Sequence, residues 1–106
     1  MVLVPFPYTD RNTRQRRPAL VISSGGIGPG DALLWVLMIT SADHRGWPGD
    51  TDLTDASGST GLKARSIVRT AKIATVETRD ADVIGRVPPK ILRTIESRVR
   101  DVVGLR

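Results

Sequence analysis

The sequence contains no cysteine and a single histidine, His44. The lack of cysteine excludes a disulfide framework, a thiolate metal site and a cysteine nucleophile. One histidine excludes a histidine pair for acid–base chemistry and a metal site built from several histidines of one subunit. The acidic residues Asp50, Asp52 and Asp55 do not have the spacing of a calcium loop. We therefore expect a function that needs neither a metal nor a cofactor.

Long apolar runs are missing as well. The longest one, residues 32–39, is far shorter than the roughly 20 residues that cross a bilayer as a helix, and no segment has the pattern of a signal peptide. With 106 residues, 40% of them hydrophobic and 25% charged, the chain has an ordinary globular composition. These features predict a single domain over residues 1–106, a cytoplasmic location and no membrane contact.

Positive charge is concentrated in arginine. The net charge is +5, and 13 of the 16 cationic residues are arginines. A guanidinium presents a planar fork of donors that matches a phosphate, whereas an ammonium acts as a point charge. Four arginines fall within seven residues: Arg11, Arg14, Arg16 and Arg17. A polyanionic partner explains this cluster, and so does a solvated loop in an arginine-rich protein, so the composition leaves both interpretations open.

The hydrophobic patterns predict mainly β structure. Residues 2–8 alternate, but the two prolines within them favour an edge strand or a strand that runs into a bulge. Residues 32–40 have the pattern of a central buried strand, with Trp35 in the core. Residues 66–78 alternate over a length that fits one bent strand or two strands meeting near Ala71. Shorter strands are predicted at residues 18–23 and 50–55, and loops at residues 9–17, 24–30, 41–50 and 56–61.

The C-terminal segment predicts the one clear helix. Pro88 and Pro89 suit a helix start, where the missing N–H is no loss, and Gly104 suits the C-terminal cap. Apolar residues recur at spacings of three and four and form one face: Ile91, Leu92, Ile95, Val99, Val102 and Val103. Several short strands, glycine- and proline-rich turns and one terminal helix indicate a small β-barrel with a packed helix.

Three other features invite a functional interpretation. The glycine-rich residues 25–30 do not fit a phosphate-binding loop, because Pro29 interrupts them, no lysine follows and the next segment is a strand. His44 follows the central strand and is a candidate for acid–base chemistry, although an ordinary surface histidine is the commoner case. Trp47 either stacks on a nucleobase or caps the end of the barrel.

Arg17 and Thr40 form the strongest pair of candidates. Arg17 stands where the arginine-rich loop enters a buried strand, and Thr40 and Ser41 close the predicted central strand. If these two strands are neighbours, a guanidinium and a hydroxyl converge on a space of phosphate size. Such fixed donors stabilise the charge of a pentacovalent phosphorane.

Six short blocks run in order through nearly the whole chain. They are Val-Leu-Val-Pro-Phe-Pro-Tyr-Thr-Asp (2–10), Arg-Arg-Pro-Ala-Leu-Val-Ile-Ser (16–23), Ile-Thr-Ser (39–41), Trp-Pro-Gly-Asp (47–50), Gly-Leu-Lys (61–63) and Ser-Ile-Val-Arg (66–69). Together they resemble the MazF/PemK-type toxins of bacterial type II toxin–antitoxin systems. The resemblance implies a small SH3-like barrel of the MazF/PemK/CcdB toxin type, mainly β with a C-terminal helix. It also implies a homodimer and an antitoxin whose acidic tail competes with RNA for the dimer groove.

The activity that this resemblance implies is metal-independent, sequence-specific cleavage of single-stranded RNA such as mRNA. The 2′-hydroxyl attacks its own phosphodiester and leaves a 2′,3′-cyclic phosphate and a 5′-hydroxyl. The matching positions make Arg17 the group that stabilises the phosphorane, Thr40 a hydrogen-bond donor to a phosphate oxygen and Arg69 an anchor for an adjacent phosphate. The flanking loops are expected to contact RNA through Arg11, Arg14, Arg16, Ser41, His44 and Trp47.

The proton acceptor of this reaction stays open. Some members of the family carry an acidic residue two positions after the matching arginine, where this chain has Ala71. A guanidinium does not give up its proton, so Arg17 is no base, and Asp10, Asp43 and His44 are the candidates. Two alternative functions also stay open. One is a gyrase poison on the same fold, which would not need Arg17 and Thr40, and the other is a catalytically weak member that keeps RNA or antitoxin binding.

Overall fold

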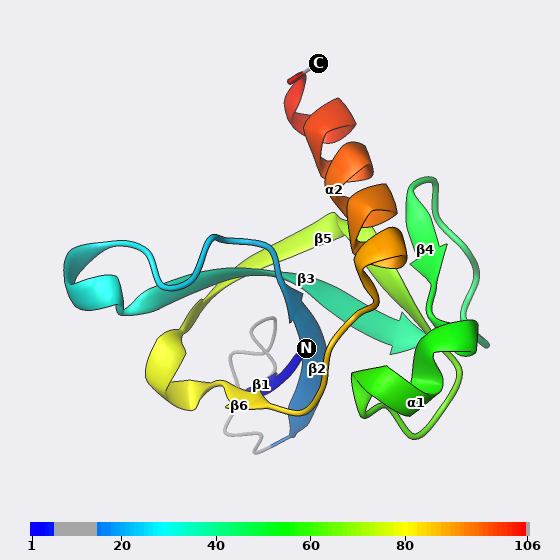
Figure 1. Ribbon diagram of the computed structural model, residues 1–106, viewed down its shortest axis with the longest axis horizontal. Coiled ribbons are helices and arrows are strands. Elements are labelled where there is room, and N and C mark those ends of the chain that lie inside the picture. The colour runs from blue at the N-terminus through cyan, green and yellow to red at the C-terminus, as the bar shows by residue number, and fades with distance from the viewer. Residues whose placement is uncertain (6–14, 106) are drawn as a thin grey trace.

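The structure, a computed structural model, describes residues 1–5 and 15–105 of the chain (Figure 1). Six antiparallel strands form one sheet in the order β4–β5–β3–β2–β1–β6, which curls into an open barrel with a helix projecting from it. The predicted class, mainly β with a C-terminal helix, is confirmed. The strands are β1 (Val2–Pro5), β2 (Arg16–Val21), β3 (Leu33–Ser41), β4 (Asp50–Asp52), β5 (Ser66–Glu77) and β6 (Asp82–Val83), the helices are α1 (Ser57–Thr60) and α2 (Pro89–Val103), and three 3-10 turns cover Pro29–Asp31, Thr54–Ala56 and Thr78–Asp80.

β3 lies at the centre of the sheet, between β2 and β5, as the sequence predicts. Its side chains alternate between two apolar clusters, because successive residues of a strand point to opposite faces. Val36 and Met38 belong to a cluster with residues of β1, β2 and β5. Leu37 and Ile39 belong to the other cluster, which includes Ile95 of α2. Burial on both faces makes β3 a fixed base for the residues at its end.

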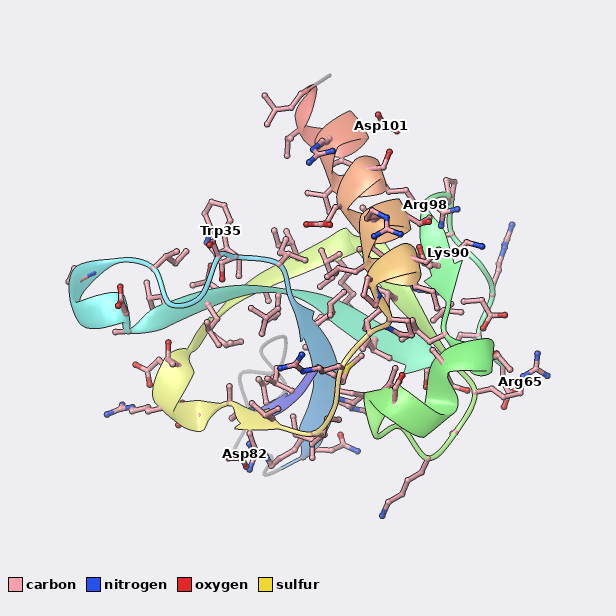
Figure 2. The ribbon with its side chains drawn as sticks, in the orientation of Figure 1. Trp35, Arg65, Asp82, Lys90, Arg98 and Asp101 are labelled. Carbon is pink, nitrogen blue, oxygen red and sulfur yellow. The ribbon has the colours of Figure 1, made fainter. Side chains whose placement is uncertain are left out.

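Trp35 departs from the prediction. The alternation of β3 puts it on the same face as Leu37 and Ile39, yet it is 50% exposed. α2 packs on this face around Leu37 and Ile39 and then projects away from the sheet, so the described residues leave much of Trp35 uncovered (Figure 2). The prediction of a core tryptophan is wrong, because a strand pattern does not indicate how far along a face the covering helix reaches.

β1 is not an edge strand, the first of the two alternatives that its prolines favour, and the second, a bulge, would fall at residues outside the described part. It pairs with β2 along its whole length and with β6 through Val2 and Leu3. Pro5 stands at the end of β1, beyond the residues that pair with β6, so it removes no hydrogen bond toward that strand. Of the loop predicted at residues 9–17, residues 9–14 lie outside the described part, and Arg16 and Arg17 already belong to β2.

Residues 56–61, predicted as a loop, contain the short helix α1. Serine and glycine are weak helix formers, so tertiary contacts hold this turn. The Ser59 hydroxyl donates to the Ala56 carbonyl at 3.2 Å, and the Arg86 backbone N–H donates to the Ser59 carbonyl at 2.8 Å. The second of these bonds joins the α1 segment to the chain that leads from β6 to α2.

Gly61 follows α1 at the point where the chain passes the backbone of Ile84. Its φ is +77°, and a Cβ at this position would lie 2.1 Å from the Ile84 carbonyl oxygen. We expect Gly61→Ala to lower the free energy of unfolding by about 2–4 kcal/mol, because left-handed strain and the steric clash add. Urea denaturation measures this loss. Gly58→Ala is the control, since a Cβ there meets nothing within 4 Å, and equal losses for both variants would contradict the prediction.

β5 is one strand with an irregular step, in agreement with the predicted bent strand. Its register pairs Ile73 with Leu37 and Val68 with Ile39, so the four residues 69–72 stand opposite Met38 alone. Such a bulge bends a strand and redirects its side chains. The irregular step includes Ala71, the point at which the alternative prediction has two strands meet.

α2 begins and ends where the sequence predicts. Pro89 is its first residue, and Gly104 caps it with a φ of +77°. Ile95 is fully buried, while Val102 and Val103, near the C-terminal end, are exposed. Ile91, Leu92 and Val99 pack partly buried on the same cluster as Ile95. None of the described helices has the length and apolar character needed to span a membrane.

Candidate active site

A pocket of about 270 Å³ opens beside the C-terminal end of β3. Its lining residues come from β2, β3, β5 and the loop after β3: Arg17, Met38, Ile39, Thr40, His44, Arg69 and Lys72. Met38 and Ile39 are buried and supply apolar walls. The described lining holds three cationic side chains and no carboxylate. Such a composition attracts anions.

The side chains of Arg16 and Arg17 point to different sides of the sheet although the two residues are neighbours in sequence. Arg17 lines the pocket, whereas Arg16 does not. Arg16 binds at the β1–β6 side of the sheet, where its guanidinium donates to the Asp82 carboxylate at 2.6 Å and to the carbonyls of Leu3 and Asp80 at 2.9 and 2.8 Å. The period of two along a strand explains this separation.

Thr40 and His44 meet at the end of β3. The Thr40 Oγ1 and the His44 Nδ1 lie 3.3 Å apart, within hydrogen-bond distance. The His44 backbone N–H donates to the Ser41 carbonyl at 3.1 Å, so a tight turn brings the imidazole back toward Thr40. The Ser41 hydroxyl accepts the Asp43 N–H at 3.2 Å and stabilises the same turn, and the Ser41 side chain does not line the pocket.

Arg69 is buried, with 7% of its surface exposed, and its guanidinium contacts the loop between β3 and β4. Its Cζ lies 3.9 Å from the centroid of the Trp47 ring, its Nη2 donates to the Arg45 carbonyl, and its Nε is 3.6 Å from the Asp50 carboxylate. A guanidinium over an indole face gains cation–π attraction. Arg69 therefore anchors this loop in addition to lining the pocket.

Trp47 is 42% exposed and packs beneath Arg69, so it does not line the described pocket. Its backbone N–H donates to the Asp50 carboxylate at 2.8 Å. The contact with Arg69 is neither of the two roles left open for Trp47, nucleobase stacking or capping of the barrel end. The remaining predicted RNA-binding residues, Arg11 and Arg14, lie outside the described residues.

Two residues of the site region escape the sequence reasoning. Lys72 lines the pocket because the bulge of β5 turns it there. Arg98 reaches from α2 to β4, where its Nη1 donates to the Asp50 carbonyl and, at 2.7 Å, to the Thr51 hydroxyl (Figure 2). The spacing of three between Arg69 and Lys72 gives no signal for Lys72, because a regular strand would point them to opposite faces. Nothing in the helix pattern marks Arg98.

The acidic residues near the site have partners within the protein. Asp50 faces Arg69 across the β4–β5 pair. Asp52 accepts hydrogen bonds from the Thr54 hydroxyl at 2.5 Å and the Thr54 N–H at 2.8 Å. The hydroxyl bond first, and the backbone bond second, hold the pKa of the Asp52 carboxyl below its ordinary value. The described residues contain no cluster of acidic and histidine side chains able to hold a metal ion.

Solved structures similar to this fold include toxins and their complexes with antitoxins. The Mycobacterium tuberculosis toxin MazF-mt6 superposes with a TM-score of 0.73 at 17% identity, over 99% of this chain and 97% of that one. The MazE–MazF complex of Deinococcus radiodurans gives 0.70 at 21% identity, over 99% and 91%. A mycobacterial endoribonuclease bound to its cognate antitoxin gives 0.69 at 18% identity, over 99% and 91%. A search among curated proteins finds no significant match.

The family follows from the sequence itself. The model of the PemK-like, MazF-like toxins of type II toxin–antitoxin systems matches residues 1–103. The chain therefore belongs to this family, and it is a type II toxin of the MazF/PemK class, a class known for endoribonucleases.

Proposed function

We propose that this toxin is a sequence-specific endoribonuclease that cleaves single-stranded RNA, including mRNA, without a metal or cofactor. The observation that carries the proposal is the pocket in which Arg17 and Thr40 meet beside two further cations, Arg69 and Lys72. A phosphodiester carries the negative charge that such a lining attracts. The 2′-hydroxyl of the nucleotide before the cut is the nucleophile, and a 2′,3′-cyclic phosphate and a 5′-hydroxyl are the products.

The residues of the pocket have separate roles in this proposal. Arg17 stabilises the charge that develops on the phosphorane, since fixed donors aimed at that charge lower the barrier. Thr40 donates its hydroxyl hydrogen to a phosphate oxygen. Arg69 supplies positive charge from below the adjacent phosphate while it anchors the loop. Lys72 adds a further cation on the same strand.

RNA is bound, in this proposal, by side chains near the start of β2 and by others around the turn after β3. The first group is Arg11, Arg14 and Arg16, of which Arg16 would have to leave Asp82 to reach RNA. The second group is Ser41, His44 and Trp47, of which His44 lines the pocket. An antitoxin with an acidic tail competes with RNA for the same cations. Solved relatives of this fold include complexes with an antitoxin, which supports such a partner here. We place the toxin and its RNA substrate in the cytoplasm.

Incubation with a long unstructured RNA in EDTA tests the activity. We expect cleavage at a short recurring sequence, with a 2′,3′-cyclic phosphate on one product and a 5′-hydroxyl on the other. A 2′-deoxy nucleotide at the cleaved position should abolish the reaction, because it lacks the attacking hydroxyl. Products with a 5′-phosphate, or cleavage of the 2′-deoxy substrate, would contradict the mechanism. Accumulation of a gyrase–DNA cleavage complex without RNA cleavage would favour the gyrase poison instead.

We also propose that the toxin is a homodimer. Several large apolar side chains are exposed: Trp35 and Ile73 on the face of the sheet against which α2 packs, and Val102, Val103 and Leu105 at the end of α2. Trp35 is visible on that side of β3 in Figure 2. Exposed apolar surface is typical of protein–protein contacts. A second copy of the chain is the partner we propose for it.

Trp35→Asp is expected to convert the dimer into a monomer of 11.5 kDa. The buried carboxylate would lose its hydration without gaining a partner, so the association constant should fall by at least about a hundredfold. Light scattering coupled to size exclusion measures the mass. Val83→Asp is the control, because Val83 is 81% exposed on β6. A dimer that survives Trp35→Asp, or one that dissociates equally with Val83→Asp, would contradict this interface.

A further inference from the structure

The chain's only histidine lies against Thr40 in the pocket. The Thr40 Oγ1 and the His44 Nδ1 are 3.3 Å apart, and both residues belong to the pocket lining with Arg17. The turn that follows β3 places the ring there through the hydrogen bond from the His44 N–H to the Ser41 carbonyl. The imidazole is therefore brought to Thr40 by local backbone geometry.

We propose, resting on the ribonuclease activity proposed above, that His44 is the general base that takes the proton from the 2′-hydroxyl. When the Nδ1–H donates to the Thr40 Oγ1, the neutral ring leaves its Nε2 unprotonated and able to accept. The hydroxyl hydrogen of Thr40 then remains for a phosphate oxygen. Thr40 thus orients the base and touches the substrate at once, in the way that a third group orients the base of other nucleophilic sites.

The proton and bond changes of the step balance. The His44 Nε2 accepts the proton of the 2′-hydroxyl while the O2′–P bond forms. The P–O5′ bond breaks, and the leaving O5′ takes a proton from solvent water. The imidazolium returns its proton to solvent, so the net reaction moves one proton from O2′ to O5′ and consumes no water. Arg17 stabilises the phosphorane charge throughout.

Among the residues that the structure describes, the other candidate acceptors lack this placement. The Asp43 side chain does not line the pocket, and Ala71 has no acidic group where some relatives carry one. Asp10 lies outside the described residues. Asp50 faces the buried Arg69 in an ion pair.

Arg69 fixes the loop that carries the proposed base. Its Nη2 donates to the carbonyl of Arg45, the residue after His44, and its guanidinium stacks on Trp47 three residues beyond His44. We assign Arg69 this positioning role in addition to the phosphate contact proposed above. The base is therefore tied to β5 through two contacts on one side of it and to β3 through the turn on the other.

The charged groups around His44 define the expected pH dependence. Arg17 faces the pocket from β2 and Arg69 and Lys72 from β5, while Asp43 and Arg45 flank His44 on its own loop. Guanidinium, ammonium and carboxylate groups in general keep their charges through the neutral range, and imidazole changes its charge there. Because the base must be neutral, the cleavage rate should rise with pH across this range and then level off.

His44→Gln tests the proposal in single-turnover cleavage of an RNA that the unsubstituted toxin cuts. We expect a rate about a hundredfold lower, a much smaller change in RNA affinity, and no rise of rate with pH. Glutamine keeps an N–H for Thr40 but accepts no proton near neutral pH. Added imidazole should partly restore His44→Ala, because the side chain is exposed to solvent. Asp43→Asn, the competing candidate on the same loop, should keep both the rate and the pH profile.

Each other outcome has a distinct meaning. If the unsubstituted toxin cuts no RNA, the proposed function fails. If it cuts RNA and His44→Gln keeps its rate and pH profile, only the assignment of His44 fails. Loss of the pH-dependent rise in Asp43→Asn would transfer the role to Asp43. A substrate with sulfur in place of the 5′-bridging oxygen needs no acid for its leaving group, so restoration of His44→Gln by this substrate would make His44 the acid and overturn its role as base.

Discussion

Replacing Arg17 by alanine is expected to lower the single-turnover rate of RNA cleavage by about a thousandfold while the protein stays folded. Arg17 is an exposed strand residue that lines the pocket, so its loss removes a charged donor without opening the core. The loss of one preorganised donor to a developing oxyanion costs roughly 10²–10³ in rate, and a charged donor to a phosphorane stands at the upper end of that range. Quenched cleavage assays at saturating protein measure the rate.

Two further variants make this result specific. Arg17→Lys keeps the charge and loses the planar fork, so we expect a rate between those of the alanine variant and the unsubstituted toxin. Arg93→Ala removes the same charge from the exposed side of α2, away from the pocket lining, and should leave the rate unchanged. Full activity in Arg17→Ala, or an equal loss in Arg93→Ala, would show that cleavage depends on net charge or on another residue.

Replacing Arg69 by alanine is expected to destabilise the protein by about 3–5 kcal/mol. The Arg69 and Asp50 side chains are 9% and 12% exposed, so the substitution leaves a carboxylate in the interior without its counter-charge. Removing one partner of a buried ion pair costs that amount because the other charge stays desolvated. The loss of the Trp47 contact adds to it. Urea denaturation, followed by tryptophan fluorescence, measures the free energy of unfolding.

An exposed pair of the same chemistry provides the control. Arg79 and Glu77 are 2.9 Å apart with side chains 80% and 50% exposed, so Arg79→Ala should cost less than about 1 kcal/mol. The double variant Arg69→Met with Asp50→Asn should be more stable than Arg69→Ala, since it leaves no unpaired charge. Equal losses for the buried and exposed arginines would contradict the role that we give to burial.

The sequence predicts the strands and the helix well because their patterns are local. β3 and α2 are long enough for a period of two or of 3.6 to be visible, and the cap at Gly104 is a property of the chain nearby. The two-residue β6 has no periodicity to detect. α1 forms through contacts with the segment after β6, which no local pattern contains.

The same distinction, between local patterns and contacts of distant segments, applies to the residues of the candidate site. Arg17 and Thr40 were predicted together because they stand at the ends of strands that turn out to be neighbours. The separation of Arg16 from Arg17 depends on where β2 begins, and the burial of Arg69 depends on the loop that folds over it. The prediction that Trp35 lies in the core is wrong because it rests on a local apolar pattern. The exposure of Trp35 depends on the direction of α2, which that pattern does not contain.

Because of the bulge in β5, the positive charge of the pocket depends on how β5 is paired with β3. In a regular strand, side chains alternate between the two faces. Positions 69 and 72 are three apart, so they would point to opposite faces. The step opposite Met38 brings both cations to one pocket. A regular pairing of β5 with β3 would leave the net charge of +5 intact and divide these two cations between the faces of the sheet. A relative with the same residues at these positions and a regular step would therefore carry a different electrostatic surface.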